Sequence, residues 1–309
     1  MKHHTIIILL ILILGGCATP GKGKDTNTQT PDSYVVTGTQ GLELNFEPGL
    51  PPSRIRGEEL PIRINVRNLG KIEVTNAKIV LGGYDQNIIT GFTGSSISGS
   101  TIRIHNLPPR TFLNQQGGYM TYTITGTIAQ NVITGTYSPT ITATACYTYK
   151  TEASANLCID PNPYNNEPNK PCRLGQVNLL DSGNGQGAPV QITNVNVDSS
   201  TKTMTITFYI RNSGGGSPFD SAKLSECPQG LTPNNRDKIK VDSVKVGSTD
   251  ITSNCQPGRE LTLYQGSGVL VCTYDLPSSS PGAYMTELSI VLSYGYTKSI
   301  MRRVEITKS

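Results

Sequence analysis

The sequence predicts an all-β protein in which two tandem antiparallel β-sandwich domains follow an N-terminal signal peptide and a disordered tether. Short runs alternate apolar and polar residues with a period of two, and clusters of Gly, Pro and Asn separate these runs. Such alternation is typical of strands with one face on a core and the other in solvent. Part of the pattern recurs at an offset of 144 to 147 residues. The recurrence predicts two copies of one domain.

Residues 1–17 carry the features of a secretion signal. Lys2 supplies a positive charge at the start, Thr5–Leu14 is almost entirely apolar, and Gly15 and Gly16 are the small residues that a signal peptidase needs. A membrane-spanning helix needs about 20 apolar residues, and this stretch is shorter. The sequence therefore predicts an exported chain rather than a retained transmembrane helix.

The end of this signal resembles the lipobox of prokaryotic lipoproteins. Leu14–Cys17 has its pattern of an aliphatic residue, two small residues and a cysteine. In that family the cysteine receives diacylglycerol and becomes the N-terminus after cleavage, so the resemblance implies that Cys17 anchors the chain to the outer side of the cell membrane. Ala18 rather than Asp follows, which resembles the pattern sorted to the outer membrane in hosts that have one. The alternative is an ordinary thiol at Cys17.

The predicted domain bounds follow from composition. The stretch from Ala18 to Asp32 has almost no apolar residues, so it cannot bury surface and is expected to be a disordered tether. Pro and Gly cluster between the two copies of the repeated pattern. The predicted parts are the signal at 1–17, the tether at 18–33, a first sandwich at 34–161, a linker at 162–188 and a second sandwich at 189–309.

The predicted strands lie between turn-forming clusters. In the first sandwich the clearest alternating runs are Leu42–Phe46, Pro61–Val66, Ile102–Ile104 and Tyr119–Ile128. The second sandwich begins with the run Val190–Val197, and Val177–Leu180 in the linker is expected to form an edge strand. No run of ten or more residues after the signal has the 3.6-residue period of an amphipathic helix.

The internal repeat consists of matching motifs at matching spacings. Gly-x-Tyr precedes Tyr-x-Tyr in both copies, at Gly135, Tyr137, Tyr147 and Tyr149 and again at Gly282, Tyr284, Tyr294 and Tyr296. An Arg-Asn pair followed by an Ala-Lys pair also recurs, as Arg67–Asn68 with Ala77–Lys78 and as Arg211–Asn212 with Ala222–Lys223. The parity of the alternation places the paired tyrosines of both copies on the apolar face, toward a core.

The cysteine count predicts disulfides. The chain has 7 cysteines, and assigning Cys17 to lipid leaves an even number in an exported chain. The disulfide candidates are Cys146, Cys158, Cys172, Cys227, Cys255 and Cys272. The sequence does not choose among the many ways of pairing them.

Two pairings compete for Cys158. Cys146 and Cys158 would form a cross-strand bridge if they lie on adjacent strands of a hairpin, whereas Cys158–Cys172 would close the loop rich in Pro and Asn. Three cysteines on each side of the linker imply either a bridge between the domains or two unpaired thiols. If Cys146 pairs with Cys158, Cys172 is free to reach the second domain.

The residues that carry chemistry predict neither an enzyme nor a cofactor or metal site. His105 is the only histidine after the signal; it lies on the solvent side of an alternating run, and no nucleophile motif flanks it. No Cys-x2-Cys spacing favours zinc. The Gly-x-Gly-x-Gly run at 183–187 lacks the strand–loop–helix context of a phosphate loop. The oxygen-bearing residues near Asp160 and Asp181 are more simply turn formers than calcium ligands.

Charge and aromatic content limit the expected partners. The net charge of +4 comes without a long basic run, so a nucleic-acid partner is not expected. Sandwich modules that bind glycans stack sugars on exposed aromatics, usually including Trp, and this chain has no Trp. The candidate stacking residues are Tyr84, Tyr164 and Tyr264, with Tyr34 at the start of the first domain. The expected partners are the membrane, through the N-terminal lipid, and a surface protein or glycan.

With these strands and this repeat, the chain resembles tandem immunoglobulin-like modules of prokaryotic cell-surface proteins. Arg67–Gly70 and Arg211–Gly214 are similar to a turn of the adhesion-associated CARDB-type sandwich, and Cys146–Pro161 is similar to segments of secreted proteins from small-genome archaea. Antibody domains differ, because they carry a Trp and place Tyr two residues before Cys.

The signal, lipobox, tether and repeat together lead to one leading expectation about function. The protein is expected to be a lipid-anchored, non-catalytic surface protein that serves adhesion, envelope structure or complex assembly. A glycan- or peptide-binding module is the alternative, and an envelope enzyme with a site between the domains is a further one.

Overall fold

A computed structural model describes residues 36–165, 168–175, 177, 179, 185–276 and 282–308. The predicted signal peptide, Cys17, the tether and Tyr34 lie outside the described residues. The described residues belong to one compact unit, Val35–Ser309. The structure is 56% strand and 6% helix, and most strands pair antiparallel, so the predicted all-β, immunoglobulin-like sandwich class is confirmed.

Each repeat has a four-stranded antiparallel sheet of its own. In the first repeat the order is β1-β3-β8-β5, with bounds β1 Leu42–Phe46, β3 Glu59–Asn68, β8 Tyr119–Ile128 and β5 Ile89–Gly94. In the second repeat the order is β11-β12-β18-β16, with bounds β11 Val190–Ser199, β12 Thr203–Asn212, β18 Ser267–Asp275 and β16 Cys255–Gln256. The period-two runs form these strands because alternate side chains are buried, as the pattern of β3 shows.

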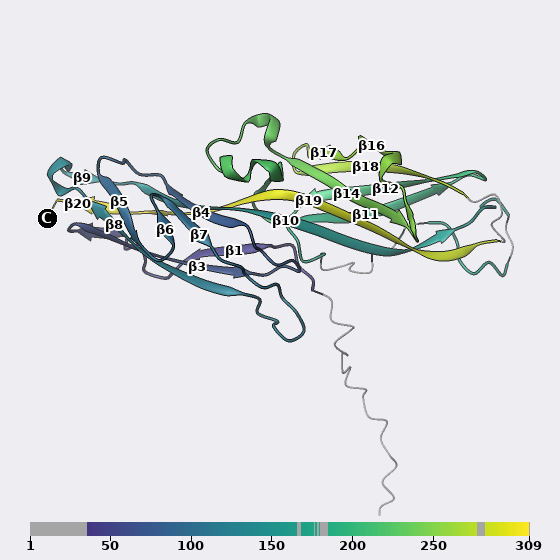
Figure 1. Ribbon diagram of the computed structural model, residues 1–309, viewed down its shortest axis with the longest axis horizontal. Helices are drawn as coiled ribbons and strands as arrows, with labels where there is room; N and C mark the ends of the chain where they lie inside the picture. The colour runs from purple at the N-terminus through teal and green to yellow at the C-terminus, as the bar shows by residue number, and fades with distance from the viewer. Residues whose placement is uncertain are drawn as a thin grey trace, which may run out of the picture. The chain divides into compact units, whose positions relative to one another are not determined.

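A nine-stranded sheet, called here the shared sheet, contains strands of both repeats (Figure 1). Its order is β15 Thr249–Asp250, β14 Lys238–Val246, β19 Tyr284–Arg303, β10 Thr140–Ile159, β4 Ala77–Gly82, β7 Thr101–Ile104 and β6 Ile97–Ser98. Two further strands pair beside this path, β13 Ser217–Phe219 with β19 and β17 Glu260–Thr262 with β14. The two central strands, β10 and β19, are 20 residues each and pair along their full length.

The C-terminal end of the chain returns to the first repeat. Strand β20 (Glu305–Thr307) pairs in parallel with β2 (Arg54–Arg56) and antiparallel with β9 (Thr136–Tyr137). Short 3-10 helices complete the described elements: η2 Gln130–Val132, η3 Ser221–Glu226, η4 Pro233–Asn235 and η5 Thr252–Asn254. Segments from both sides of the predicted linker therefore share two sheets. The predicted domain bounds mark the two copies of the repeat, but the copies are joined through these sheets.

The register of β10 and β19 relates the repeats about one residue pair. Tyr147 lies opposite Tyr296, and Tyr149 lies opposite Tyr294. Thr148 lies opposite Gly295 between them. The repeat offset of 147 (294 − 147 and 296 − 149) converts each tyrosine into its counterpart, so an approximate twofold axis passes through the Thr148–Gly295 pair.

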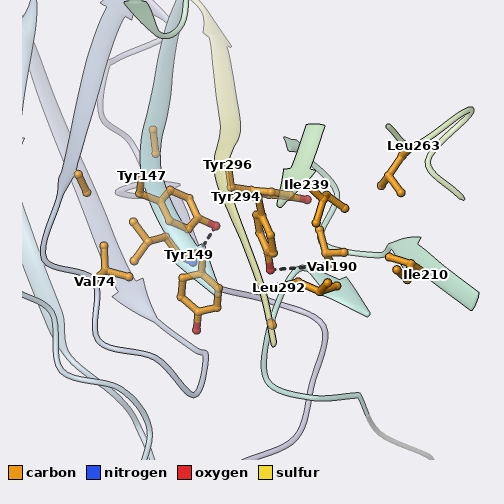
Figure 2. Packing of buried hydrophobic residues seen from close by; sticks show 14 of the residues in the cluster. Val74, Tyr147, Tyr149, Val190, Ile210, Ile239, Leu263, Leu292, Tyr294 and Tyr296 are labelled. Carbon is orange, nitrogen blue, oxygen red and sulfur yellow. Dashed lines mark hydrogen bonds between the residues drawn. The ribbon is translucent and has the colours of Figure 1, made fainter. Parts of the chain in front are cut away.

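Four buried tyrosines surround this axis on the core side of the shared sheet (Figure 2). The ring centroids of Tyr147 and Tyr296 lie 5.8 Å apart, and each Tyr-x-Tyr pair is in edge contact within its own strand. Edge contacts of this kind suit the aromatic quadrupole, and a buried hydroxyl needs a hydrogen-bond partner. Burial raises the pKa of all four phenols, that of Tyr296 to about 12.

The tyrosine hydroxyls bind the same backbone positions in both repeats. The first strand of each sandwich donates its first N–H to the first tyrosine: Leu42 to Tyr147 at 3.2 Å and Val190 to Tyr294 at 3.3 Å. The second tyrosine accepts the N–H four residues after the repeated Asn: Tyr149 from Ile72 at 3.2 Å and Tyr296 from Gly216 at 2.9 Å. In each repeat, the Tyr-x-Tyr pair therefore binds the first strand and the first turn at equivalent backbone positions.

The repeated Arg-Asn-x-Gly sequence forms the same turn twice. The amide of Asn68 donates to the carbonyl of Ile72, and that of Asn212 donates to the carbonyl of Gly216, each at 2.8 Å. Gly70 donates its N–H to the Asn68 side chain. A Cβ at Gly70 would overlap the Tyr149 hydroxyl, so the close approach of the tyrosine requires glycine there.

The predicted equivalence of the two Ala-Lys pairs is wrong. Ala77–Lys78 begins β4, which pairs with β10, whereas Ala222–Lys223 lies in η3. The structural counterpart of β4 is β14, which pairs with β19 on the equivalent side. The second repeat carries a longer connection before that strand. We call residues 220–237 the insertion.

Six cysteines form three disulfides among the described residues: Cys146–Cys227, Cys158–Cys172 and Cys255–Cys272. Of the two pairings proposed for Cys158, the loop closure with Cys172 is the one formed. The predicted hairpin between Cys146 and Cys158 is wrong, because both residues lie in the uninterrupted strand β10. Cys146–Cys227 joins the two repeats, as one of the predicted alternatives required.

One continuous core runs through both repeats. The predicted inward faces of the Tyr strands are buried, including Ile141 and Ala145 in β10 and Leu288 and Leu292 in β19. In the predicted edge strand of the linker, Val177 and Leu179 are buried and bridge to Val195 and Ala155. The described residues contain no helix long and apolar enough to cross a membrane.

We predict that Gly70→Ala lowers the free energy of unfolding by about 1–3 kcal/mol, the usual cost of forcing extra atoms into a packed site. The added methyl would displace Tyr149 and open the first turn. Gly91→Ala is the matched control, since no atom lies within 4 Å of its Cβ position. Urea unfolding of both variants measures the effect, and equal stability of the two variants would contradict the proposed role of the tyrosine contact.

Candidate functional site

The candidate site is a hollow on the outward face of the shared sheet, in the first repeat. Two adjoining cavities of about 460 and 330 Å³ share Thr101 and Arg103. We call the combined hollow the basic groove. It is defined by Lys78, Ser96, Thr101, Arg103, His105 and Ser225.

The alternation of β4 and β7 places the cations of this groove in solvent. Ile79, Ile102 and Ile104 point into the core. Their neighbours in the same strands, Lys78 and Arg103, therefore point outward. Arg103 is exposed and Lys78 is half-buried. The same parity exposes His105, which was predicted to face solvent.

Lys78 and Arg103 lie directly opposite each other on neighbouring antiparallel strands. Like charges in this position destabilise a sheet, because the Cβ atoms of opposed residues are only about 4.5–5.5 Å apart. Among the described residues, neither side chain has an Asp or Glu within ion-pair distance. The groove therefore concentrates positive charge that the described part of the protein does not neutralise.

Beside the groove, a row of hydroxyl groups continues across the same face of the sheet. Thr101 lies opposite Val80, Val80 opposite Thr144, and Thr144 opposite Ser299. The hydroxyl oxygens of Thr144 and Ser299 are 2.8 Å apart. Farther along β19, Met301 and Arg303 are exposed on the same face. This face of the sheet thus combines cations, hydroxyls and the exposed apolar side chain of Met301.

The insertion forms one wall of the groove. The disulfide Cys146–Cys227 holds it against β10, and Phe219 and Leu231 pack around this disulfide. Lys78 donates from Nζ to the carbonyl oxygen of Ser225 at 3.0 Å. Burial against this wall lowers the pKa of Lys78. The wall therefore fixes the position of one cation while Arg103 stays open to solvent.

His105 contacts the other end of the groove. Its Nε2 lies 3.2 Å from the Ser96 hydroxyl. No group of three or more His, Cys, Asp and Glu side chains that could hold a metal ion occurs in the described parts of the chain.

The three predicted stacking tyrosines do not form one surface. Tyr84 is half-buried and meets Phe92 edge-on at a centroid distance of 5.3 Å, so its ring is not open for stacking. Tyr164 and Tyr264 are each 79% exposed, but they lie in separate turns of different segments. Neither lines the basic groove.

An exposed aromatic that the sequence analysis did not single out is Tyr119, at the start of β8. Its hydroxyl donates to Asn65 Oδ1 at 2.8 Å, and the Arg67 guanidinium lies 5.3 Å from its ring centroid. These contacts hold the ring on the outer face of the first repeat's own sheet. The alternating pattern of β8 could have identified the outward position of Tyr119. Its partners Asn65 and Arg67 could not be found this way, because they depend on strand register.

The groove itself was also missed by the sequence analysis. The pattern placed His105 on the solvent side of a strand, and Arg103, two residues earlier, shares its parity. The pattern could not place Lys78 opposite Arg103, because the register of β4 and β7 is set by their packing. The repeat motif matches Ala222–Lys223 to the start of β4, so the sequence gives no sign that these residues belong to an insertion that forms a wall of the groove.

Comparisons with known proteins find no family. No protein-family model matches the sequence, and no curated protein matches it. Among solved structures, the chain is similar to Escherichia coli alpha-2-macroglobulin activated by porcine elastase, with 10% identity and a TM-score of 0.18. That match covers 89% of this chain and 22% of the other, so this chain spans about a fifth of that protein.

A second solved structure is the partial N-terminal region of an enterococcal surface protein. Its identity is 8% and its TM-score 0.17, covering 92% of this chain and 97% of that one. Likenesses at these TM-scores carry no argument about function. The function therefore has to be argued from the chain's own residues.

We predict that Arg103→Gln stabilises the protein by roughly 0.2–1 kcal/mol at low salt, since it removes a like-charge pair across two strands. The gain should shrink in high salt, which screens exposed charges. Arg211→Gln is the matched control, because its neighbours across the sheet, Gln191 and Ser267, are uncharged. Urea unfolding at two salt concentrations tests this, and destabilisation by Arg103→Gln would show that the cation has an internal partner.

Proposed function

We propose that this protein is a lipid-anchored, non-catalytic surface protein whose fused repeats serve adhesion, envelope structure or complex assembly. The observation that carries the proposal is the full-length pairing of β10 with β19, together with a disulfide between the repeats. A hinge between the repeats would have to break this ladder of hydrogen bonds. Such a joint suits a load-bearing or presenting role outside the cell.

The disulfides indicate an extracytoplasmic location. Disulfides persist in oxidising compartments and are rare in the cytosol. The three bridges of this chain include one between distant segments, with a sequence separation of 81 residues. An exported protein with this framework fits the signal peptide predicted at residues 1–17.

Anchoring through Cys17 is the second part of the proposal. It rests on the resemblance of Leu14–Cys17 to a lipobox, with the cysteine directly after an apolar segment. Each buried acyl CH₂ contributes about 0.8 kcal/mol, so two chains hold a protein stably where one chain holds it marginally. The polar stretch from Ala18 to Asp32 would separate the folded unit from the lipid head groups.

Binding of a surface glycan is a second candidate function, which the basic groove favours. The groove provides cations that no acidic side chain of the described residues neutralises, and a row of hydroxyls lies beside it on the same face, a combination that suits an anionic, hydroxyl-rich ligand. Adhesion and glycan binding are compatible, because an anchored protein can use such a groove to hold a neighbouring surface.

We predict that Cys17→Ser moves the full chain from the membrane to the soluble extracytoplasmic fraction of a bacterial host that processes lipoproteins. Palmitate labelling should be lost at the same time, since the thiol is the acylation site. Cys255→Ser with Cys272→Ser is the control for lost cysteines, and it should keep both the label and the membrane fraction. A Cys17→Ser protein that stays labelled and membrane-bound would refute the anchor.

A further inference from the structure

We propose that the basic groove binds an acidic polysaccharide, a chain of sugars that carries carboxylate or sulfate groups. The inference rests on the proposed surface function and names the partner of that surface. It follows from the opposed pair of cations in the groove, from the row of hydroxyls on the same face of the sheet, from a third cation farther along that face, and from the pairing of the strands beneath.

The opposed cations select an anion. Lys78 and Arg103 face each other across β4 and β7 with no acidic neighbour among the described residues. An anionic group placed between them would relieve their repulsion and form charge-assisted hydrogen bonds with both. Lys78 is already positioned by its bond to Ser225, so little of its freedom has to be lost on binding.

The row of hydroxyls on this face favours a sugar. Thr101 in the groove and Thr144 and Ser299 beside it can each donate and accept a hydrogen bond, as sugar hydroxyls do. Val80, which lies between Thr101 and Thr144 in the same row, is buried. A simple anion would use the cations and leave this row of groups without a role.

The outward face beside the groove extends far enough for a chain. The same face continues along β19 past Met301 to Arg303, a third exposed cation with no acidic partner in the described parts of the chain. By strand spacing and rise, Arg303 lies roughly 20–25 Å from Arg103 across the sheet. Charges at this spacing suit a ligand with acidic groups repeated along its length.

The position on the sheet face argues against an acidic peptide. A peptide that binds to a sheet usually adds a strand at an edge, where backbone groups are unpaired. The backbone of β4 is paired on both sides within the sheet. The edge strand β6 lines one end of the groove, but it has only two residues, Ile97 and Ser98. The groove therefore offers side chains, which match a polysaccharide better than a peptide backbone.

The test is binding of the full chain, purified as Cys17→Ser, to four immobilised polymers. Polygalacturonate carries carboxylates, dextran sulfate carries sulfates, dextran is neutral, and polyglutamate is an acidic peptide. We expect saturable binding to at least one acidic polysaccharide, weaker binding to polyglutamate, and none to dextran. The affinity should fall as salt rises, because the contacts are ionic.

Variants locate the site. Arg103→Gln should weaken binding at least tenfold, and Lys78→Gln with Arg103→Gln should abolish it. Arg211→Gln on the second repeat should bind like the parent. Circular dichroism shows that each variant is folded, and Arg103→Gln alone keeps the test valid if the double variant unfolds.

Three results would overturn the proposal: no binding to either acidic polysaccharide at low salt, binding to polyglutamate as tight as to the polysaccharides, or equal loss in Arg103→Gln and Arg211→Gln. These failures are distinct from failure of the anchor. The anchor is decided by palmitate labelling and fractionation, whereas polymer binding is measured on protein that lacks the lipid.

Discussion

The antiparallel pairing of β10 with β19 is the constraint on which the rest of the structure depends. It places the Thr148–Gly295 pair at the centre and brings the four tyrosines together beneath it. Each tyrosine hydroxyl then binds backbone in the first strand or first turn of a repeat. The joint between the repeats and the closure of each sandwich are thus made by the same side chains.

The two repeats differ where function is proposed. The second repeat has the insertion, which crosses to the first repeat and is held by Cys146–Cys227. The first repeat has no such segment, and its β4 and β7 remain open beside that wall, where no acidic side chain of the described residues neutralises Lys78 or Arg103. The basic groove therefore lies where the insertion of one repeat meets the open strands of the other.

The sequence predicted the strand faces and the repeated Asn turn because both are local. Period-two alternation placed Tyr147 and Tyr294 inward, and Asn68 and Asn212 make the same bonds in both turns. The expected hairpin between Cys146 and Cys158 was wrong because β10 is one long strand. Residues 140–159 contain no Gly or Pro, and this absence was a sign that the strand continues without a turn. Strand register and the path of the insertion depend on packing between distant segments, so the groove could not be predicted.

The most direct test of this account is native-state hydrogen exchange of the β10 and β19 amides near Thr148 and Gly295. If the paired strands and the tyrosines below them hold the repeats together, these amides will be among the slowest to exchange and will open only with global unfolding. Fast exchange at this central pair, with slow exchange retained in β3 and β12, would contradict the account and would show two separately folded domains.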